Sequence, residues 1–370
     1  MEGVKAILKT TPLHAEHIAL GARMAEFGGW DMPIQYEGIL AEHEHTRTKT
    51  GVFDICHMGE FDLTGPTAAA DLSRLLTMNL STLTIGQCRY GFMLNDEGGV
   101  IDDLTCYRLG EEHYRLVVNA ATLDGDSAWI QSHLSPKTCF VDLSDGMAKL
   151  DVQGPMSRVD LELVFGKKLP DLGYFKSEAF RALDIDMLIS RTGYTGDWGY
   201  ELYFPVTEAV RLWRALLAHS NIKPIGLGAR DTLRLEMGYS LYGHELSSDR
   251  TPVATSRGLF LRKEGGYIGE AAVQRDVANP SEWLVGLEFD SKRAARAHDK
   301  ILVGGVEHGM VTSGSVSPSL GKAVALAFVS VQHASEGTVL DVEIRGKNFP
   351  AKVVPLPFYK QGSVRGPLQS

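Results

Sequence analysis

The sequence predicts a multidomain α+β protein whose C-terminal part is built from strands alone. Before Glu282, helix and strand patterns mix without strict alternation, which is typical of sheets covered by helices on one side. From Glu282 onward, short strands alternate with Gly, Pro and Asn turns, and no helix pattern is convincing. This second observation predicts a small all-β domain. A chain of 370 residues has room for two or three domains.

The expected helices are recognised by apolar residues at helical spacing, with a capping residue before them or a glycine after them. The first begins beside Thr11 and Pro12, and Gly28 and Gly29 end it. The expected ranges are 11–27, 39–49, 66–76, 123–133, 157–165, 207–220 and 229–237.

The expected strands lie in four groups before the C-terminal part. The first begins at Val52 and contains VFDICHM and then EFDLTG. Residues 89–119 indicate three strands, the first two joined by the glycine-rich turn NDEGG at 95–99. The segment AKLDVQG, from Ala148, indicates another strand. Residues 184–204, DIDMLISRTGYTGDWGYELYF, indicate two strands around a glycine-rich turn.

Composition excludes several classes of protein. The net charge is −9 and the sequence pI about 5.8, which argues against a nucleic-acid partner, because phosphate binding needs clustered Lys and Arg. No apolar run is long enough to span a membrane, and the first ten residues lack the apolar core of a secretory signal. We therefore expect a cytoplasmic protein. The paired histidines lack further ligands beside them, so no metal site is expected.

The first candidate for chemistry is the pair Asp102-Asp103 in GGVIDDLTCYRL. Successive side chains of a strand face opposite ways, so at least one carboxylate points toward an otherwise apolar surface. Such a carboxylate is a candidate acid, base or hydrogen-bond acceptor. Turn chemistry or a salt bridge at the sheet edge would explain the pair equally well.

Glycine-rich turns frame two further candidates. In SRTGYTGDWGYELY, glycines permit close approach of a ligand to the backbone, and Glu201 follows in the strand beside Tyr203. In GLGARDTLRLEMGYSLYGHE, Arg230 lies in the first turn of a helix, where the helix dipole mildly opposes a cation. An arginine there usually has another partner, either a ligand or a carboxylate in a structural ion pair. Carboxylates, tyrosines and an arginine around glycine turns suit a planar ligand that forms hydrogen bonds.

These motifs resemble those of the T-protein family of the glycine cleavage system. Matching segments follow the same order from about Thr11 to about Tyr359, so the resemblance covers nearly the whole chain. The motifs SRTGYTG-x-x-G-[FY]-E and GLGARD-x-x-RLE are together specific to the folate-binding aminomethyltransferase group. Further matching segments are TPLHAEH, GARMAEFGGWDMPIQY, GVFDICHMGEF, GGVIDDL, LVVNAA, QGP, YIGEAA, VTSGSVSPSLGKAVALAFV and PFY.

The resemblance implies a three-domain cloverleaf around a central folate channel, with two α+β sandwiches and a C-terminal all-β barrel or jelly-roll domain. Residues 1–54 plus 141–275 would form a first, discontinuous folate-binding domain. Residues 55–140 would form an inserted ferredoxin-like domain, and residues 280–370 the C-terminal β-domain.

The implied function is transfer of an aminomethyl carbon from the lipoyl arm of H-protein to tetrahydrofolate, which yields 5,10-methylenetetrahydrofolate and ammonia in glycine cleavage. Tetrahydrofolate would be the one-carbon acceptor, with no metal. The implied partner is the lipoylated H-protein, with neither nucleic acid nor membrane involved.

The resemblance also assigns roles to residues. Asp103 matches the family's essential carboxylate beside the folate ring nitrogens and is the expected catalytic residue. Glu201 matches the carboxylate that pairs with the pterin amino and ring N–H groups, and Arg230 matches a pocket arginine. Arg365 is the nearest match to a C-terminal arginine on the partner side of the channel, although its spacing is shifted. The other expected folate-binding residues are Tyr90, Tyr107, Asn119, Tyr194 and Tyr239.

The chain departs from the family pattern mainly in the segment 244–257, where His244 replaces the usual Gln. This departure leaves open a folate-dependent demethylase that takes a methyl group from a sulfonium or methoxy donor. A folate-binding relative from iron–sulfur assembly is disfavoured because its Lys-Gly-Cys motif is missing. The folate-coupled half of an amine oxidase would need a flavin domain, whose dinucleotide fingerprint is also missing.

Overall fold

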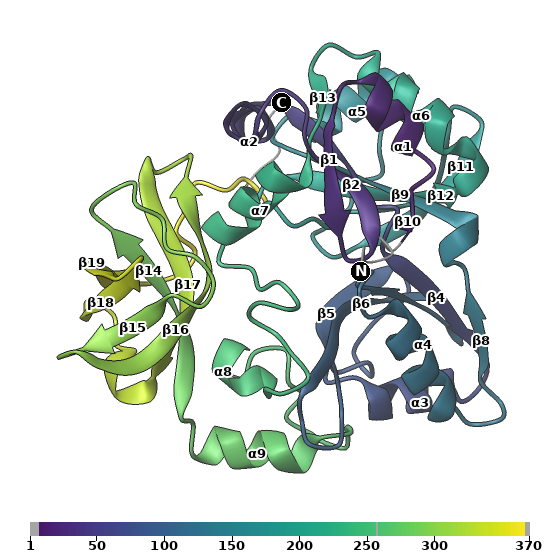
Figure 1. Ribbon diagram of the computed structural model, residues 1–370. Helices are drawn as coiled ribbons and strands as arrows, with labels where there is room; N and C mark the ends of the chain where they lie inside the picture. The colour runs from purple at the N-terminus through teal and green to yellow at the C-terminus, as the bar shows by residue number, and fades with distance from the viewer. Residues whose placement is uncertain (1–6, 257, 367–370) are drawn as a thin grey trace, which may run out of the picture. The chain divides into compact units, whose positions relative to one another are not determined.

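The computed structural model describes residues 7–256 and 258–366 in two compact units. The first unit comprises the described residues of 1–60, 142–231 and 362–370, and the second comprises those of 61–141 and 232–361. We describe each unit by itself (Figure 1). The domain boundaries expected from the sequence stay a prediction.

A six-stranded sheet forms the centre of the first unit, in the order β10-β11-β12-β9-β3-β13. Its strands are β3 (Thr50–Asp54), β9 (Met147–Gln153), β10 (Ser177–Ala182), β11 (Ile185–Ser190), β12 (Gly199–Pro205) and β13 (Ile222–Pro224). The helical segments of this unit are α1 (His14–Ala19), α2 (Ile39–Thr48), α5 (Ser157–Phe165), α6 (Ala209–Leu217) and the short 3₁₀ turns η1 (Ser144–Gly146) and η2 (Val206–Glu208).

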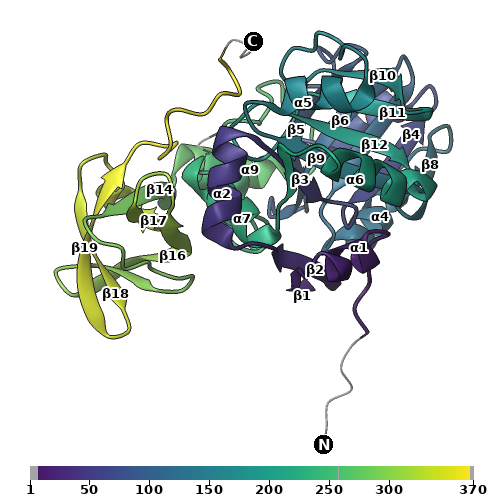
Figure 2. The same ribbon diagram turned by 90° about the horizontal axis from the view of Figure 1, so that it is seen from above.

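The two faces of this sheet differ in chemistry. Leu150 and Val152 of β9 and Leu202 of β12 pack into an apolar core with residues of α5 and α6, two helices that lie alongside these strands (Figure 2). Because strand side chains alternate, the residues between them face the other way. The opposite face therefore carries Lys149, Asp151, Gln153, Glu201 and Tyr203.

The expected helix over residues 11–27 is wrong in its second half. α1 ends at Ala19, and Gly21 then has a φ of +73°. The following strand β1 (Arg23–Phe27) pairs antiparallel with β2 (Trp30–Gln35) across the turn at Gly28 and Gly29. Both turn glycines have positive φ, so the residues expected to stop a helix instead form a hairpin.

A five-stranded sheet falls almost entirely in the second unit, in the order β5-β6-β7-β4-β8. Its strands are β4 (Gly59–Thr64), β5 (Gln87–Leu94), β6 (Val100–Gly110), β7 (His113–Val118) and β8 (Cys139–Asp142), and the accompanying helices are α3 (Ala68–Leu75) and α4 (Leu123–Ser132). Leu104 and Cys106 of β6 pack in an apolar core with Ile130 of α4. By alternation, Asp102 shares this helix-covered face and Asp103 lies on the other.

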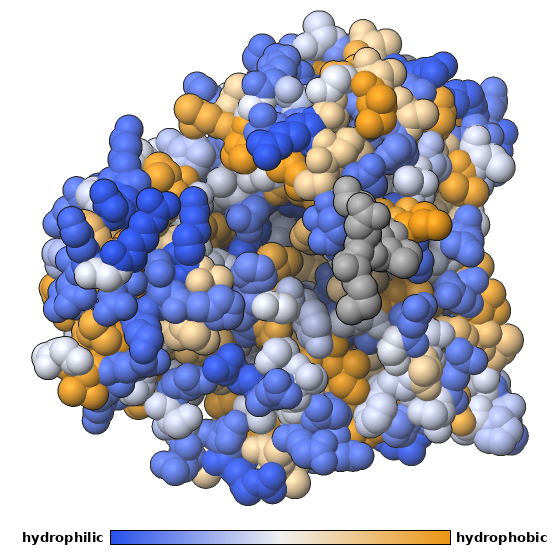
Figure 3. Space-filling model, viewed as in Figure 1, coloured by the Kyte–Doolittle hydropathy of each residue, from blue (hydrophilic) through white to orange (hydrophobic). Residues whose placement is uncertain are grey.

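The C-terminal strands form a closed barrel in the second unit, drawn in green and yellow in Figure 1, in the order β14-β17-β16-β15-β18-β19. Its strands are β14 (Glu282–Phe289), β15 (Lys300–Val303), β16 (Val306–Ser317), β17 (Lys322–Ser330), β18 (Val339–Ile344) and β19 (Lys347–Val354), with the 3₁₀ turn η3 (Val331–His333). Ala325 and Ala327 of β17 face one apolar core, and Leu326 and Phe328 face another. Hydrophilic residues gather on much of its visible surface (Figure 3).

Three helices complete the described chain, α7 (Leu227–Glu236), α8 (Pro252–Ser256) and α9 (Glu270–Ala278). The predicted fold class, α+β with a C-terminal all-β barrel, is confirmed. In the described part of the chain, no helix has both the length and the apolar character needed to cross a membrane.

Candidate active site

The residues expected to bind folate belong to both units, and each unit holds a cluster of its own. Tyr194, Glu201, Arg230 and Arg365 belong to the first unit. The second unit contains Tyr90, Asp103, Tyr107, Asn119 and Tyr239.

In the second unit, Asn119 joins two neighbouring carboxylates. Its side-chain amide donates hydrogen bonds to Oδ1 of Asp102 at 2.8 Å and to Oδ1 of Asp103 at 2.9 Å. Its backbone N–H donates to Oδ2 of Asp102 at 2.9 Å. The Tyr90 hydroxyl donates to Oδ2 of Asp103 at 2.8 Å. The half-buried Asp103 carboxylate is therefore held in one orientation by hydrogen-bond donors on two other strands or loops.

A third carboxylate, Asp126 of α4, belongs to the same group, which we call the aspartate cluster (Asp102, Asp103 and Asp126). Both oxygens of Asp126 are buried without a hydrogen-bond partner among the described residues. Burial, reinforced by the charge of Asp126, raises the pKa of Asp102 well above its ordinary value. Burial raises the pKa of Asp126 to about 7, and burial together with the Asp102 charge raises that of Asp103 to about 7. At neutral pH, Asp102 therefore keeps its proton, whereas Asp103 and Asp126 are partly ionised.

The raised pKa of Asp103 predicts that stability falls as the pH rises. The unfolded chain releases this proton near the ordinary pKa of 3.8, and the folded protein releases it near 7. Between these values the folded state binds more protons than the unfolded state, so the free energy of unfolding decreases with pH. One pH unit corresponds to about 1.4 kcal/mol, so this carboxyl accounts for at most about 4 kcal/mol.

Urea denaturation of the wild-type protein and the Asp103→Asn variant from about pH 4 to pH 8 measures this effect. The asparagine does not titrate, so the difference in unfolding free energy should move in favour of the variant as the pH rises, and level off above about pH 7. A difference that stays constant over the whole range would contradict the raised pKa.

The first unit brings together four buried or half-buried charges on neighbouring strands and α7, which we call the charge cluster (Lys149, Asp151, Glu201 and Arg230). In the register of β9 and β12, Glu201 is opposite Asp151 and Tyr203 is opposite Lys149. Arg230 donates from Nη1 to Oδ2 of Asp151 at 2.7 Å, and its guanidinium lies 5.0 Å from the centre of the Tyr194 ring. The ion-pair role considered for Arg230 is thus present, and its contact with a ligand stays a prediction.

Glu201 is held as an ionised acceptor. Thr192 and Tyr203 each donate a hydroxyl hydrogen bond to Oε2 at 2.8 Å. Burial by itself raises the pKa of Glu201, but the Lys149 charge, these hydrogen bonds and the Arg230 charge together lower the pKa below its ordinary value. Its neighbour differs, because burial raises the pKa of Asp151 to about 6 in spite of the Arg230 charge. At neutral pH, Glu201 can accept hydrogen bonds from ligand N–H groups.

Sequence reasoning missed Lys149, Asp151 and Asp126. A signal for the first two was present, because AKLDVQG places polar side chains at every second position of an otherwise apolar strand. That alternation predicts one polar face on a buried strand. Asp126 had no such signal, since its position on α4 is unremarkable in sequence.

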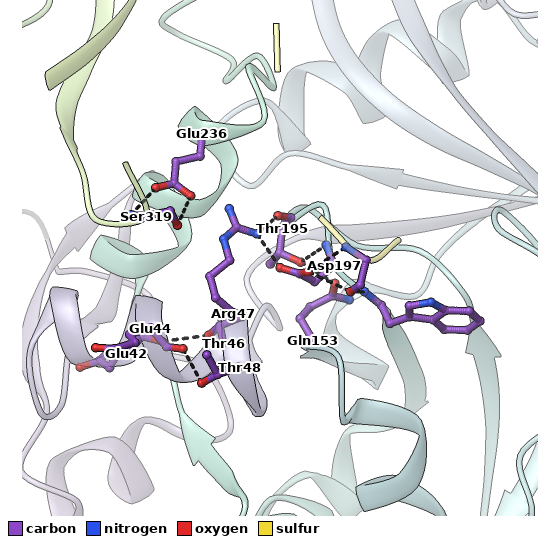
Figure 4. A network of polar contacts seen from close by, with 12 residues as sticks. Glu42, Glu44, Thr46, Arg47, Thr48, Gln153, Thr195, Asp197, Glu236 and Ser319 are labelled. Carbon is purple, nitrogen blue, oxygen red and sulfur yellow. Dashed lines mark hydrogen bonds and ion pairs between the residues drawn. The ribbon is translucent and has the colours of Figure 1, made fainter. Parts of the chain in front are cut away.

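The glycine-rich turn of the first unit is tied down by a polar network (Figure 4). Arg47 of α2 donates from Nη1 to the Thr195 carbonyl at 2.6 Å and to Oδ2 of Asp197 at 2.5 Å. The Thr195 hydroxyl donates to Oε1 of Gln153 at 2.9 Å. A Cβ atom at Gly193 or Gly199 would collide with the Gln153 side chain. The glycines of this motif therefore make room for the network that fixes the loop before Glu201.

The C-terminal segment of the first unit packs on the same turn. Asp197 accepts hydrogen bonds from the backbone N–H and the hydroxyl of Ser363, at 3.0 and 2.8 Å. Arg191 donates to the Val364 carbonyl at 2.8 Å. The next residue, Arg365, is exposed. Its expected contact with a partner stays a prediction.

The remaining expected site residues differ in exposure. Tyr107 is fully buried, on the same face of β6 as Asp103. Tyr90, Asn119, Tyr194 and Tyr239 are half-buried. Within residues 7–256 and 258–366, no group of three or more His, Cys, Asp or Glu side chains is arranged to hold a metal ion.

Two family models match the chain, the GCVT N-terminal domain over residues 13–264 and the glycine cleavage T-protein C-terminal barrel domain over residues 283–360. The chain belongs to the glycine cleavage T-protein family. An aminomethyltransferase from Moorella thermoacetica is 43% identical over 362 residues, which cover 96% of this chain and 99% of the relative. An aminomethyltransferase from Bacillus cereus (strain AH187) is 40% identical over 361 residues, with the same coverage.

A solved structure is also similar to this T-protein family member. It is the glycine cleavage system aminomethyltransferase T from Bartonella henselae, with a TM-score of 0.91 and 35% sequence identity. The match covers 96% of this chain and 99% of that one. The family and its named members identify the chain as a transferase of the aminomethyltransferase type.

Proposed function

We propose that this T-protein family member transfers the aminomethyl carbon carried on the lipoyl arm of H-protein to tetrahydrofolate. The products are 5,10-methylenetetrahydrofolate, ammonia and the reduced lipoyl arm. The main support for tetrahydrofolate as the acceptor is the Glu201 carboxylate. Hydrogen bonds from Thr192 and Tyr203 and the charge of Lys149 keep this carboxylate ionised. A fixed carboxylate of this kind matches the adjacent amino and ring N–H groups of a pterin, with two charge-assisted hydrogen bonds.

When bound, the folate would supply its two nitrogens N5 and N10, which replace the donor sulfur and the donor amine on the methylene carbon. The two protons that these nitrogens lose would leave with the sulfur as thiol and with the amine as ammonia. The part of Asp103 in this reaction is electrostatic. Its carboxylate stabilises the positive charge that develops on carbon and nitrogen as the C–S bond breaks. Tyr90 and Asn119 hold the carboxylate in a fixed orientation before the reaction, which lowers the cost of reorganisation.

The test is a mixing experiment with purified full-length protein, tetrahydrofolate and aminomethylated lipoyl H-protein. A sulfonium methyl donor runs in parallel. We expect 5,10-methylenetetrahydrofolate and ammonia in equal amounts from the lipoyl donor, and no folate product from the methyl donor. Formation of 5-methyltetrahydrofolate from the methyl donor alone would contradict the proposed donor.

The second candidate is a folate-dependent demethylase that uses a sulfonium or methoxy donor. It is favoured by the unusual residues of the segment 244–257. In the structure, His244 Nδ1 lies 3.0 Å from the Thr312 carbonyl oxygen, and Arg250 donates to Glu282 at 2.7 Å. Both side chains therefore contact other residues of the second unit. The reaction with the methyl donor in the mixing experiment tests the demethylase alternative directly.

A further inference from the structure

Lys149 is a buried cation with poor hydrogen-bonding partners. Its side chain is 2% exposed. The nearest acceptor of its ammonium group is the thioether sulfur of Met58, at 3.7 Å, which is a weak acceptor. Its ion pair with Glu201 is 3.9 Å long, too long for a hydrogen bond. Among the described residues, its ammonium group also lies over the face of the Tyr203 ring, whose centre is 5.0 Å away.

A buried ammonium group without an oxygen acceptor is costly, because it has given up its bonds to water. Balance of charge alone would explain a lysine here, since Lys149 and Arg230 together offset Asp151 and Glu201. Balance of charge does not explain the geometry, however. Arg230 bonds its carboxylate at 2.7 Å, whereas Lys149 stays 3.9 Å from Glu201 with its donors unused by oxygen.

Building on the proposed function, we propose that Lys149 donates a hydrogen bond to the ring carbonyl oxygen of the acceptor, the 4-oxo group of the pterin. Along one edge, a pterin presents an amino group, a ring N–H and then this carbonyl. Glu201 accepts from the first two and Lys149 donates to the third. A carboxylate and an ammonium 3.9 Å apart are spaced to contact neighbouring atoms of one ring edge.

The position of Lys149 is consistent with this role. The Glu201 side chain is 13% exposed, so Lys149 lies deeper than its neighbour. Lys149 and Glu201 lie on adjacent strands, and their side chains are on the same face of the sheet. The pairing of β9 with β12 fixes their relative positions. Lys149 is therefore a residue that determines which ring is accepted, because it favours an acceptor atom at position 4 over a donor.

The experiment compares two ligands that differ at position 4 and, as a consequence, in the hydrogen on ring nitrogen 3. The contact of that nitrogen with Glu201 is common to all the variants, so it cancels when their ratios are compared. Equilibrium titration under reducing conditions gives the dissociation constants of tetrahydrofolate and of its 4-amino-4-deoxy analogue for the full-length protein. The same constants are measured for the Lys149→Met variant, which keeps the side-chain length but removes the donors. The matched control is Lys223→Met, which removes an exposed lysine paired with Glu37 in the same unit.

We expect the ratio of the two dissociation constants to shift by about 10- to 100-fold between the wild-type protein and Lys149→Met, as the loss of a hydrogen bond to a charged group predicts. Lys223→Met should keep the wild-type ratio. If Lys149→Met does not fold, Lys149→Gln, which retains an amide donor, should show a smaller shift in the same direction.

An equal loss of affinity for both ligands would overturn the proposal, because a lysine that only balances charge does not distinguish the 4-oxo from the 4-amino ring. An unchanged ratio in either folded variant would overturn it as well. Failure of the wild-type protein to bind tetrahydrofolate would overturn the proposed function together with this inference. These outcomes separate the two proposals.

Discussion

Replacement of Asp103 by Asn should lower kcat by about 100- to 1,000-fold, the usual cost of losing one electrostatic contact with the transition state. The asparagine keeps the size of the side chain and can still bond to Tyr90 and Asn119. It removes the negative charge that we propose stabilises the developing cation. The dissociation constant for tetrahydrofolate should change by less than about threefold, because the lost interaction forms mainly in the transition state.

The pH profile separates this role from a structural one. Burial and the Asp102 charge raise the pKa of Asp103 to about 7. Because the ionised Asp103 carboxylate is the proposed active form, kcat/KM of the wild-type protein should rise with pH up to about 7. This rise should be missing from the pH profile of the Asp103→Asn variant. Asp96→Asn, a change of an exposed aspartate in the β5–β6 turn, is the matched control and should behave as wild type. Near-normal turnover of Asp103→Asn would refute the assigned role.

The second large effect is expected at Glu201. Glu201→Gln should raise the dissociation constant for tetrahydrofolate by about 10- to 100-fold, because a neutral amide forms weaker hydrogen bonds with the ring N–H groups than a carboxylate does. At saturating folate, kcat should fall much less than KM rises, since binding rather than chemistry is impaired. Calorimetric titration and initial rates measure the two quantities separately.

Two further variants test whether a disturbed sheet, rather than a lost contact with the ligand, explains a weaker binding of tetrahydrofolate. Glu201→Gln leaves Lys149 without its charge partner, so part of any loss in binding could reflect a disturbed sheet. Adding Lys149→Met removes the unpaired ammonium and should restore the thermal midpoint without restoring affinity. Glu178→Gln, an exposed position on β10 of the same sheet, should leave affinity unchanged. Wild-type affinity in Glu201→Gln would exclude this carboxylate from the acceptor site.

The local sequence predicted those helices whose tertiary surroundings favour the same structure. The range 157–165 was predicted as observed for α5, where apolar residues at helical spacing are followed by the terminating Gly166. The ranges of α2 and α4 were predicted to within a residue at each end. The segment 11–27 failed because residues 23–27 pair with a second strand, and that partnership outweighs the helix preference of the local sequence. The barrel was predicted as strands, but its closure depends on pairings between strands far apart in sequence.

Some features of the candidate site could likewise be predicted from the sequence, and others could not. Asp103 and Glu201 could be singled out as candidates because carboxylates in strands are unusual. Their roles, which the resemblance implies, stay predictions. The contacts of Lys149 and Asp151 depend on the register between β9 and β12, which no local pattern specifies. The raised pKa of Asp103 was likewise hidden, because it depends on burial and on the charge of its neighbour Asp102.

The proposed transfer is tested most sharply by a single-turnover reaction of the full-length protein with tetrahydrofolate and H-protein whose aminomethyl carbon is labelled with carbon-13. We expect the label to appear in the methylene group of 5,10-methylenetetrahydrofolate at the rate at which ammonia is released. Omission of either tetrahydrofolate or this protein should abolish both the transfer of label and the release of ammonia. Label that remains on the lipoyl arm, or that leaves it without entering folate, would rule out the proposed transfer to tetrahydrofolate.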